Sequence, residues 1–230
     1  MQDTIIELGG VTKTYQQGKL DVRAVDALDL KIRAGDFAVL CGPSGSGKTT
    51  VLNMMGLLDA PTRGTVTFEG RDVSGLSAAQ RATVRRDRIG FIFQAYNLIP
   101  VLTAMENAEF IMDLQGVPRP ERRVRVGQIL TDVGLAGLED RRPDELSGGQ
   151  QQRVAIARAI AAGPAVVLAD EPTANVDSET AATILDLMET LNRERGVTFV
   201  FSSHDSLVIE RAGRVVRLRD GHLESDEARS

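Results

Sequence analysis

The sequence predicts an α/β fold in which a mostly parallel sheet carries a small antiparallel β subdomain and an inserted α-helical subdomain. Residues 37–41 and 165–169 are uninterrupted apolar runs and residues 197–202 are mostly apolar, which is typical of strands buried on both faces. Helical patterns alternate with these runs, which favours a parallel sheet covered by helices. A long helical region, residues 103–162, separates the first run from the other two and predicts the insertion.

The N-terminal part reads as a small sheet that leads into a buried strand. Turn signals stand at Gly9–Gly10 and at Gly35–Asp36. Ser77 is a plausible helix N-cap. The predicted elements of this part are strands at 4–8, 22–32, 37–41, 65–68 and 89–93, and helices from Lys48 to about Leu57 and at 77–86.

The remaining elements follow from caps and breakers. Thr103 and Glu106 form a capping box that opens the helical region. An amphipathic helix at 178–195 is stopped by Gly196. The polar residues after Gly221 are expected to fray. We expect one domain over 1–230, with a core of 1–94 and 164–230 and a helical subdomain of about 95–163.

Composition excludes several classes of protein. Apolar residues make up 42% and charged residues 26% of the 230 residues, which is ordinary for a globular chain. The net charge of −5 argues against general nucleic-acid binding, and the single Cys41 excludes an internal disulfide and a multi-cysteine zinc site. The chain has no apolar stretch of the roughly 18 residues that span a bilayer and no secretion signal at its start, so we expect it in the cytoplasm.

Residues 42–49 match the phosphate-loop pattern G-x-x-x-x-G-K-[ST]. Its glycines let backbone N–H groups converge on phosphate oxygens, and the next helix offers its positive N-terminal end. Lys48 is expected to hold the β- and γ-phosphates and Thr49 to ligate Mg²⁺. A simple Gly-rich turn is the alternative, but the strand before and the helix after favour a phosphate-loop NTPase core. The predicted nucleotide-binding residues here are Gly42, Pro43, Ser44, Gly45, Ser46, Gly47, Lys48, Thr49 and Thr50.

Two adjacent carboxylates, Asp170 and Glu171, follow a buried strand. Burying such a pair is unfavourable unless a positive partner is present, and Mg²⁺ and Lys48 are the candidates. Asp170 would hold the metal through water, and Glu171 would act as general base toward the attacking water. The alternative is a pair of acids at a solvated strand end.

Ser147 precedes a helix and is a favoured N-cap. Two glycines directly after it are unfavourable in a helix, by roughly 1 kcal/mol each relative to Ala. They make sense if bare N–H groups approach the phosphate of another molecule. The segment consists of Leu146, Ser147, Gly148, Gly149 and Gln150.

These motifs resemble the ABC ATPase family from about residue 5 to 224. Residues 146–150 look like its signature motif and lie upstream of Asp170 and Glu171, as in the family. The resemblance implies ATP and Mg²⁺ as cofactors. It also implies a dimer of two copies, in which residues 147–150 of one copy contact ATP held by the other.

Four further positions match family residues. Tyr15 matches the aromatic that stacks on adenine, and Gln94 the glutamine that senses Mg²⁺ and the γ-phosphate. His204 matches the switch histidine, and Asp177 the D-loop aspartate that links the two sites. The resemblance thus implies Thr49, Gln94 and Asp170 as the metal residues and Lys48, Glu171 and His204 as catalytic residues. Alone, each of the four has a packing or surface role as its alternative.

Within the family the chain resembles the lipoprotein-releasing and macrolide-exporter branch. The resemblance rests on the phosphate loop and on residues 56–59, 90–94, 97–107 and 169–173. Val176 and Ser203 depart from the usual Leu and Thr. This branch implies a permease with few transmembrane helices and a large extracytoplasmic domain. The segment 94–106, with the apolar residues Leu98, Ile99, Val101 and Leu102, either lines the groove for that permease or packs under a loop.

We therefore expect an ATP-hydrolysing subunit that drives a separate integral membrane permease, peripheral on the inner face of the cell membrane. A second hypothesis is a regulatory ATPase that signals through a permease-like partner to cell-wall hydrolases without moving cargo. A DNA-repair or translation ATPase is disfavoured, because the chain is acidic and has neither a coiled-coil insertion nor a second cassette.

Overall fold

The computed structural model describes residues 3–18 and 20–229, and the chain divides into two compact units. The first unit contains Met1–Arg85 and Thr198–Ser230, and the second contains Arg86–Val197. The division predicted from the sequence, 1–94 with 164–230 around 95–163, stays a prediction. Among the described residues no helix has both the length and the apolar character needed to cross a membrane.

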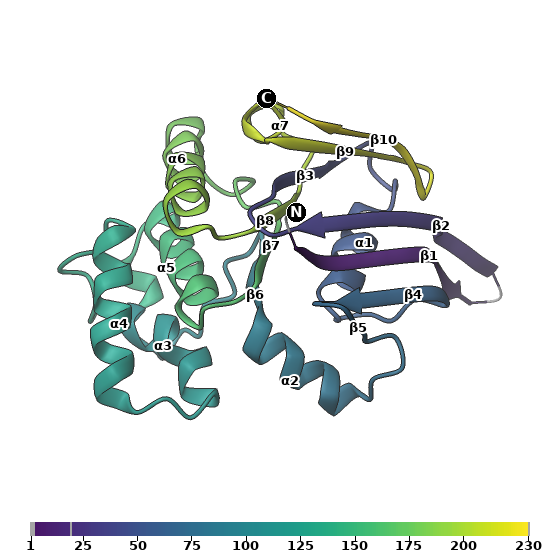
Figure 1. Ribbon diagram of the computed structural model, residues 1–230. Helices are drawn as coiled ribbons and strands as arrows, with labels where there is room; N and C mark the ends of the chain where they lie inside the picture. Colours follow the sequence, from purple (N-terminus) through teal and green to yellow (C-terminus); the bar gives the residue numbers. More distant parts are fainter. Residues whose placement is uncertain (1–2, 19, 230) are drawn as a thin grey trace. The chain divides into compact units, whose positions relative to one another are not determined.

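The first unit holds an antiparallel sheet and a mainly parallel group of strands (Figure 1). The antiparallel sheet has the order β2-β1-β4-β5, and in the second group β3 pairs in parallel with β8 and β9, while β10 runs antiparallel to β9. The strands are β1 (Thr4–Gln17), β2 (Leu20–Arg33), β3 (Phe37–Cys41), β4 (Arg63–Phe68), β5 (Arg71–Asp72), β8 (Phe199–Ser202), β9 (Arg214–Arg219) and β10 (His222–Ala228). The helices are α1 (Lys48–Met55), α2 (Ala78–Arg88), which continues into the second unit, and α7 (Ser206–Arg211).

Three phenylalanine rings pack together in the core of this unit, on β3 and β8. All of β3 is buried. The Phe37 ring lies 5.8 Å from that of Phe199 and 4.7 Å from that of Phe201, both in edge-on geometry. Such pairs add to the stabilisation from burial. They pack β3, the strand that leads into the phosphate loop, against β8.

The second unit pairs two parallel strands with a group of helices, drawn teal and green in Figure 1. Its elements are β6 (Ile89–Ile92), α3 (Ala104–Leu114), α4 (Arg119–Asp132), the short 3₁₀ helix η1 (Pro143–Glu145), α5 (Gly148–Ala161), β7 (Val166–Asp170) and α6 (Ser178–Arg195). Helix α5 packs closely on β6, because a Cβ on Gly90 would collide with the Ala159 carbonyl oxygen. This glycine lets a helix backbone approach a strand.

Several local signals predicted from the sequence are confirmed. The capping box of Thr103 and Glu106 opens α3, and α6 spans Ser178–Arg195 with Gly196 in the left-handed conformation after it. At the start of α2, the Gln80 N–H donates to the Ser77 hydroxyl. These signals act over a few residues, which is why the sequence alone reveals them.

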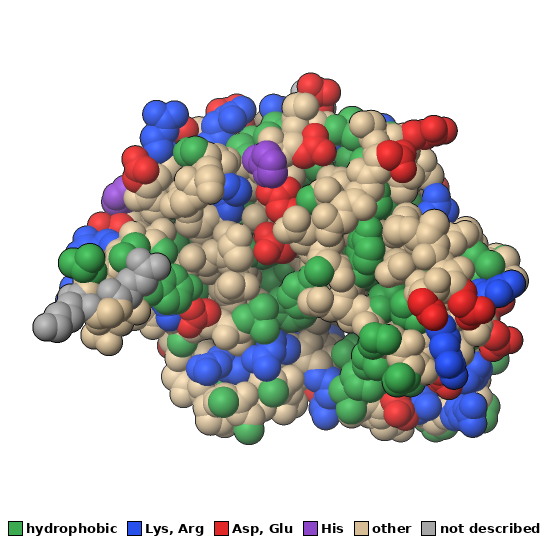
Figure 2. Space-filling model, turned by 180° about the vertical axis from the view of Figure 1, so that it is seen from behind, with side chains coloured by type: hydrophobic (Ala, Val, Ile, Leu, Met, Phe, Trp, Pro, Cys, Tyr) green, Lys and Arg blue, Asp and Glu red, His purple; other side chains and the backbone are tan. Residues whose placement is uncertain are grey.

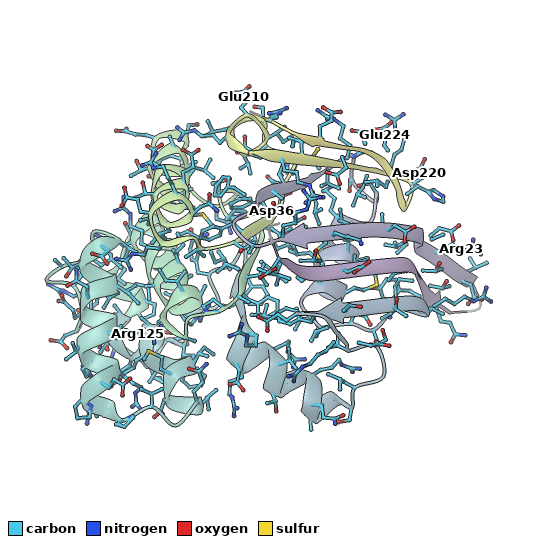
Figure 3. All side chains as sticks on the ribbon, in the orientation of Figure 1. Arg23, Asp36, Arg125, Glu210, Asp220 and Glu224 are labelled. Atoms are coloured by element: carbon cyan, nitrogen blue, oxygen red, sulfur yellow. The ribbon has the colours of Figure 1, made fainter. Side chains whose placement is uncertain are left out.

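The expected fraying after Gly221 is wrong. Strand β10 pairs with β9 along its length, and Arg214 donates two hydrogen bonds of 2.7 Å to Asp226 and one of 2.7 Å to Asp36. Figure 3 labels Asp36. A bidentate guanidinium–carboxylate pair is among the stronger polar contacts. It holds a strand whose own sequence is too polar to suggest one.

The turn predicted at Gly9–Gly10 is also wrong. Strand β1 continues through both glycines, with Gly10 at φ 54° and a shift in its pairing with β2 between Leu8 and Val11. A bulge uses the freedom of glycine inside a strand without reversing the chain. Several predicted boundaries move by a few residues as well: for example, α1 ends at Met55, β6 ends at Ile92 and β2 spans Leu20–Arg33.

Candidate nucleotide-binding site

The loop between β3 and α1 needs glycine for two different reasons. Gly45 and Gly47 have φ of 80° and 97°, in the left-handed region. A Cβ on Gly47 would lie 2.5 Å from the Ala24 carbonyl oxygen, and one on Gly42 would collide with the Leu218 carbonyl, whereas Gly45 has open space around it. The loop is therefore shaped by its own backbone and by close approach of neighbouring strands.

Lys48 and Ser46 give this loop the chemistry of an anion site. The Lys48 ammonium donates to the carbonyl oxygens of Gly42 at 2.8 Å and Pro43 at 3.0 Å, so the charge lies over the loop. The Ser46 hydroxyl is buried and has no hydrogen-bond partner within the described part of the chain. An ammonium group that lies over the loop and a buried hydroxyl without a hydrogen-bond partner are suited to bind a ligand that carries phosphate.

The first turn of α1 continues the site. Its first helical bond runs from the Val51 N–H to the Gly47 carbonyl at 2.9 Å, so the N–H groups before it have no acceptor within the helix. Thr49 is exposed in this turn, and Thr50 is partly exposed. Ser44 is exposed in the loop. The hydroxyl predicted to ligate Mg²⁺ is therefore accessible to a ligand.

Tyr15 is an exposed aromatic with an anchored hydroxyl. The hydroxyl donates to Asp59 Oδ2 at 2.8 Å, and Lys13 Nζ lies 2.5 Å from Asp59 Oδ1 and 5.0 Å from the centre of the tyrosine ring. Burial opposes the charge on Asp59, but the donors Lys13, Tyr15 and the Ala60 N–H outweigh it and keep the pKa of this carboxyl below its usual value. The ring is thus held in place while 37% of the residue stays exposed.

The strand register brings His204 next to the phosphate loop. In the parallel pair β3–β8, Leu40 lies opposite Ser202. Two residues beyond this pair, the chain reaches Gly42 after the first strand and His204 after the second. The Ser203 N–H donates to the Leu40 carbonyl at 3.1 Å. Ligands of open α/β sheets bind beyond the carboxyl ends of the strands, and both predicted residues lie there.

The second unit repeats this arrangement with other side chains. In the parallel pair β6–β7, Ile92 lies opposite Ala169, and Gln94 and Glu171 follow at the carboxyl ends. Asp170 is the last residue of β7. Glu171 has a φ of 46°, in the left-handed region, where a non-glycine residue is held only by its surroundings. The register thus brings Gln94 and Glu171 to the same edge.

Residues 147–150 open α5 as predicted. Ser147 accepts from the Gln150 N–H at 3.3 Å, and its own N–H donates to Gln150 Oε1 at 2.9 Å. The glycines also have packing reasons that sequence reasoning did not supply. A Cβ on Gly148 would lie 3.0 Å from the Tyr96 hydroxyl, and one on Gly149 would lie 2.6 Å from Thr180 Cγ2.

Comparison with known proteins identifies the family. The profile of the family described as ABC transporter matches residues 25–174. The chain belongs to this family. The fold of this ABC cassette is shared with solved dimeric structures of the ATP-binding cassette MJ0796, at TM-scores of 0.89 and 0.87 and 42% and 43% identity. Both cover 97% of this chain and 98% of the other, which confirms the predicted α/β fold class.

Relatives of this ABC cassette differ in length. An uncharacterized ABC transporter ATP-binding protein of Thermotoga maritima is 45% identical over 98% of this chain and 96% of its own length. The macrolide export ATP-binding/permease protein MacB of Syntrophobacter fumaroxidans is 46% identical over 96% of this chain but 31% of its own length. The chain therefore spans about a third of the MacB relatives that it matches.

Asp177 caps α6 in this ABC cassette. Its carboxylate accepts from the Thr180 N–H at 2.9 Å and from the Thr180 hydroxyl at 2.7 Å. These bonds, that of the backbone first, lower the pKa of Asp177. The cap is a structural reason for an aspartate here, and the role implied by the resemblance stays a prediction.

Sequence reasoning missed the residues that support the predicted ones. Asp59 accepts the hydrogen bond of the Tyr15 hydroxyl across 44 positions, and Lys13 contacts Asp59 across 46 positions. Asn175 and Arg158 contact the Gln94 loop across 81 and 61 positions. No local pattern reveals such contacts. The face shown in Figure 2 carries basic and acidic side chains interspersed.

Proposed function

We propose that this ABC cassette binds ATP and hydrolyses it to ADP and phosphate to drive a membrane permease. The observation that carries the proposal is the loop between β3 and α1, where Lys48 folds over the loop carbonyls beside an unsatisfied Ser46 hydroxyl. Tyr15, anchored through its hydroxyl, offers a ring on which adenine would stack. Phosphate and base recognition thus come from the same unit.

Each predicted side chain has a role in this proposal. Lys48 would bind the β- and γ-phosphates, His204 would steady the γ-phosphate, and Glu171 would accept a proton from the attacking water. Thr49, Gln94 and Asp170 would hold Mg²⁺, which when bound neutralises charge on the phosphates. The strained backbone at Glu171 supports a functional assignment, since such conformations cluster at active sites.

The second copy is part of the proposal. The MJ0796 cassette is described as dimeric, and in one structure as a post-hydrolysis state bound to ADP and Pi. Similarity at 43% identity supports the same pairing here, with Ser147 and the glycines after it facing ATP on the other copy. ATP binding would close the pair, and hydrolysis would reopen it.

The membrane partner is supported by the names of the relatives. The MacB proteins are called ATP-binding/permease proteins, and this chain matches about a third of their length. We propose an integral membrane permease as the partner, with the cassette peripheral on the inner face of the membrane. The nucleotide site would look the same in a regulatory ATPase that moves no cargo, so the partner decides between the two.

Phosphate release by the purified chain with Mg-ATP tests the hydrolysis. Glu171→Gln should lower kcat by roughly 10²- to 10⁴-fold and leave ATP binding intact, because it removes a base and not a phosphate contact. Glu194→Gln is the matched control, since Glu194 is exposed at the end of α6. Normal turnover by the Glu171 variant would remove Glu171 from this role.

Purification of the tagged chain from detergent-solubilised membranes with ATP present tests the partner. A few-helix permease with a large outer domain, identified by mass spectrometry, would support the exporter branch. A many-helix permease would overturn that branch, and repeated recovery without any membrane protein would contradict the transporter role. Transport by the reconstituted complex separates moving cargo from signalling.

A further inference from the structure

The loop that carries Gln94 has an unfavourable backbone. Tyr96 and Asn97, which follow Gln94 closely, have φ of 58° and 50°. Two successive non-glycine residues in the left-handed region are disfavoured, because Cβ approaches the following carbonyl oxygen. Such a conformation persists only where surrounding contacts over-determine it.

Side chains from two other segments hold this backbone. Arg158 of α5 donates to the carbonyl oxygens of Asn97 at 2.6 Å and Tyr96 at 2.8 Å. Asn175, in the loop after β7, donates through Nδ2 to the Gln94 carbonyl oxygen at 2.8 Å. The planar guanidinium reaches adjacent carbonyls with a fixed geometry, which a single ammonium cannot reproduce. Burial lowers the pKa of Arg158, in line with its position inside the unit.

The loop also contacts the segment that contains Asn175 and the first turn of α5 through the Tyr96 side chain. The Tyr96 hydroxyl donates to the Asn175 carbonyl oxygen at 3.0 Å, and Asn175 Nδ2 donates to the Gln94 carbonyl oxygen, so Asn175 and residues 94–96 are joined by two hydrogen bonds of opposite direction. The same hydroxyl lies 3.0 Å from the place of a Cβ on Gly148, in the first turn of α5. Gln152 of that helix donates to the Pro172 carbonyl at 2.6 Å. Three segments therefore meet at one phenol oxygen.

We propose that Tyr96, Asn175 and Arg158 are positioning residues that make Gln94, the first turn of α5 and the loop before Asp177 move as one body. The proposal rests on the proposed function, in which Gln94 faces the γ-phosphate and Mg²⁺. The Gln94 side chain is exposed, whereas its backbone is held by the hydrogen bond from Asn175 to the Gln94 carbonyl oxygen. A shift of Gln94 on ATP binding or hydrolysis would then be passed to Gly148 and Asp177.

The decisive variant is Tyr96→Phe, which keeps the ring and removes only the hydroxyl. Asn175→Ala removes the donor to Gln94, and Arg158→Lys replaces the fork with a point charge. Arg153→Lys is the matched control, because Arg153 lies on the same helix and donates to the Val133 carbonyl at 3.0 Å. Thermal melting of all four variants checks that each is folded.

Hydrogen exchange of the chain without nucleotide is the first measurement. Tyr96→Phe should speed exchange together in residues 94–97 and in residues 148–152, each by roughly threefold to tenfold, the usual range for one hydrogen bond. Arg158→Lys should do the same, and Arg153→Lys should leave both segments unchanged. This measurement involves neither ATP nor Mg²⁺.

Steady-state hydrolysis is the second measurement. Tyr96→Phe and Asn175→Ala should each lower kcat by about threefold to tenfold and raise the Mg²⁺ concentration for half-maximal rate, with KM for ATP within about twofold. Together they should lower kcat by less than the product of the single effects, because they break one link. A merely structural role would leave the Mg²⁺ dependence unchanged.

Three outcomes would overturn the proposal. One is unchanged exchange in both segments of Tyr96→Phe, another is faster exchange with unchanged kcat and Mg²⁺ dependence, and the third is an equal response of Arg153→Lys. Absence of hydrolysis by the unmodified chain would instead contradict the proposed function, and exchange would still show whether the three segments are linked.

Discussion

The phosphate loop and the Gln94 loop both need left-handed backbone conformations, and they stabilise them in different ways. Each follows a buried parallel strand and contains left-handed residues. In the phosphate loop these are Gly45 and Gly47, whereas in the other loop they are Tyr96 and Asn97. Glycine adopts this conformation without help, but Tyr and Asn need partners from distant segments. The left-handed backbone of the first loop is therefore encoded locally, and that of the second depends on the tertiary fold.

The largest expected effect is at Gly47. Gly47→Ala should reduce ATP affinity by about 100-fold or more, because the new Cβ would lie 2.5 Å from the Ala24 carbonyl oxygen and force the loop to shift. Gly45→Ala is the matched control, since it has a similar φ and open space around it, and it should cost only the strain of roughly 1–2 kcal/mol. Binding of a fluorescent ATP analogue measures both, and equal losses would contradict a role for the close contact.

A smaller effect is expected at Ser147. This residue caps α5 through a local contact, so the second unit also contains structure that is encoded locally. Ser147→Ala removes the acceptor of the Gln150 N–H and should lower the free energy of unfolding by about 1 kcal/mol. Ser77→Ala removes the corresponding contact with Gln80 at the start of α2 and should act similarly on stability. Only the Ser147 change should also slow hydrolysis, and chemical denaturation with rate measurements on both variants checks this.

Gly148 tests the tertiary contact with Tyr96 directly. Gly148→Ala gains helix propensity, yet its Cβ would lie 3.0 Å from the Tyr96 hydroxyl. In the Tyr96→Phe background the same change should be more favourable by about 0.5 kcal/mol, within the range for residues in contact. A double-mutant cycle of unfolding free energies measures this, and an additive cycle would argue against the contact.

The smallest effect concerns the support of Tyr15. The pKa of Asp59 is below its usual value, so its contribution to stability is present above about pH 4 and is lost as the pH falls through the lower pKa of the folded state. Asp59→Asn should therefore be less stable than the unmodified chain at pH 7, and this difference should shrink toward pH 3. Unfolding at several pH values tests it, and a constant difference would contradict the ion pair with Lys13.

The motif residues of the candidate site could be predicted from the sequence, whereas the side chains that support them could not. The glycines and Lys48 stand together within residues 42–48, and Asp170 and Glu171 are adjacent to each other, so each of these two short motifs indicates phosphate chemistry from the sequence. The supporting side chains Asp59, Asn175 and Arg158 were not predictable, because each contacts its target across more than 40 positions. Strand β10 was missed for a different reason: its own sequence is polar, and it is held by its pairing with β9 and by the Arg214–Asp226 ion pair.

By itself the sequence determined the main strands and helices other than β5, α7, β9 and β10, several helix caps and the phosphate loop, because hydrophobic period, capping and glycine freedom act within a few residues. Only the tertiary structure decided which side chains hold Tyr15 and the Gln94 loop, and why Gly148 and Gly149 must lack a side chain. Those properties depend on the strand register and on a helix packed against a strand. Contacts between segments far apart in the chain leave no periodic trace in it.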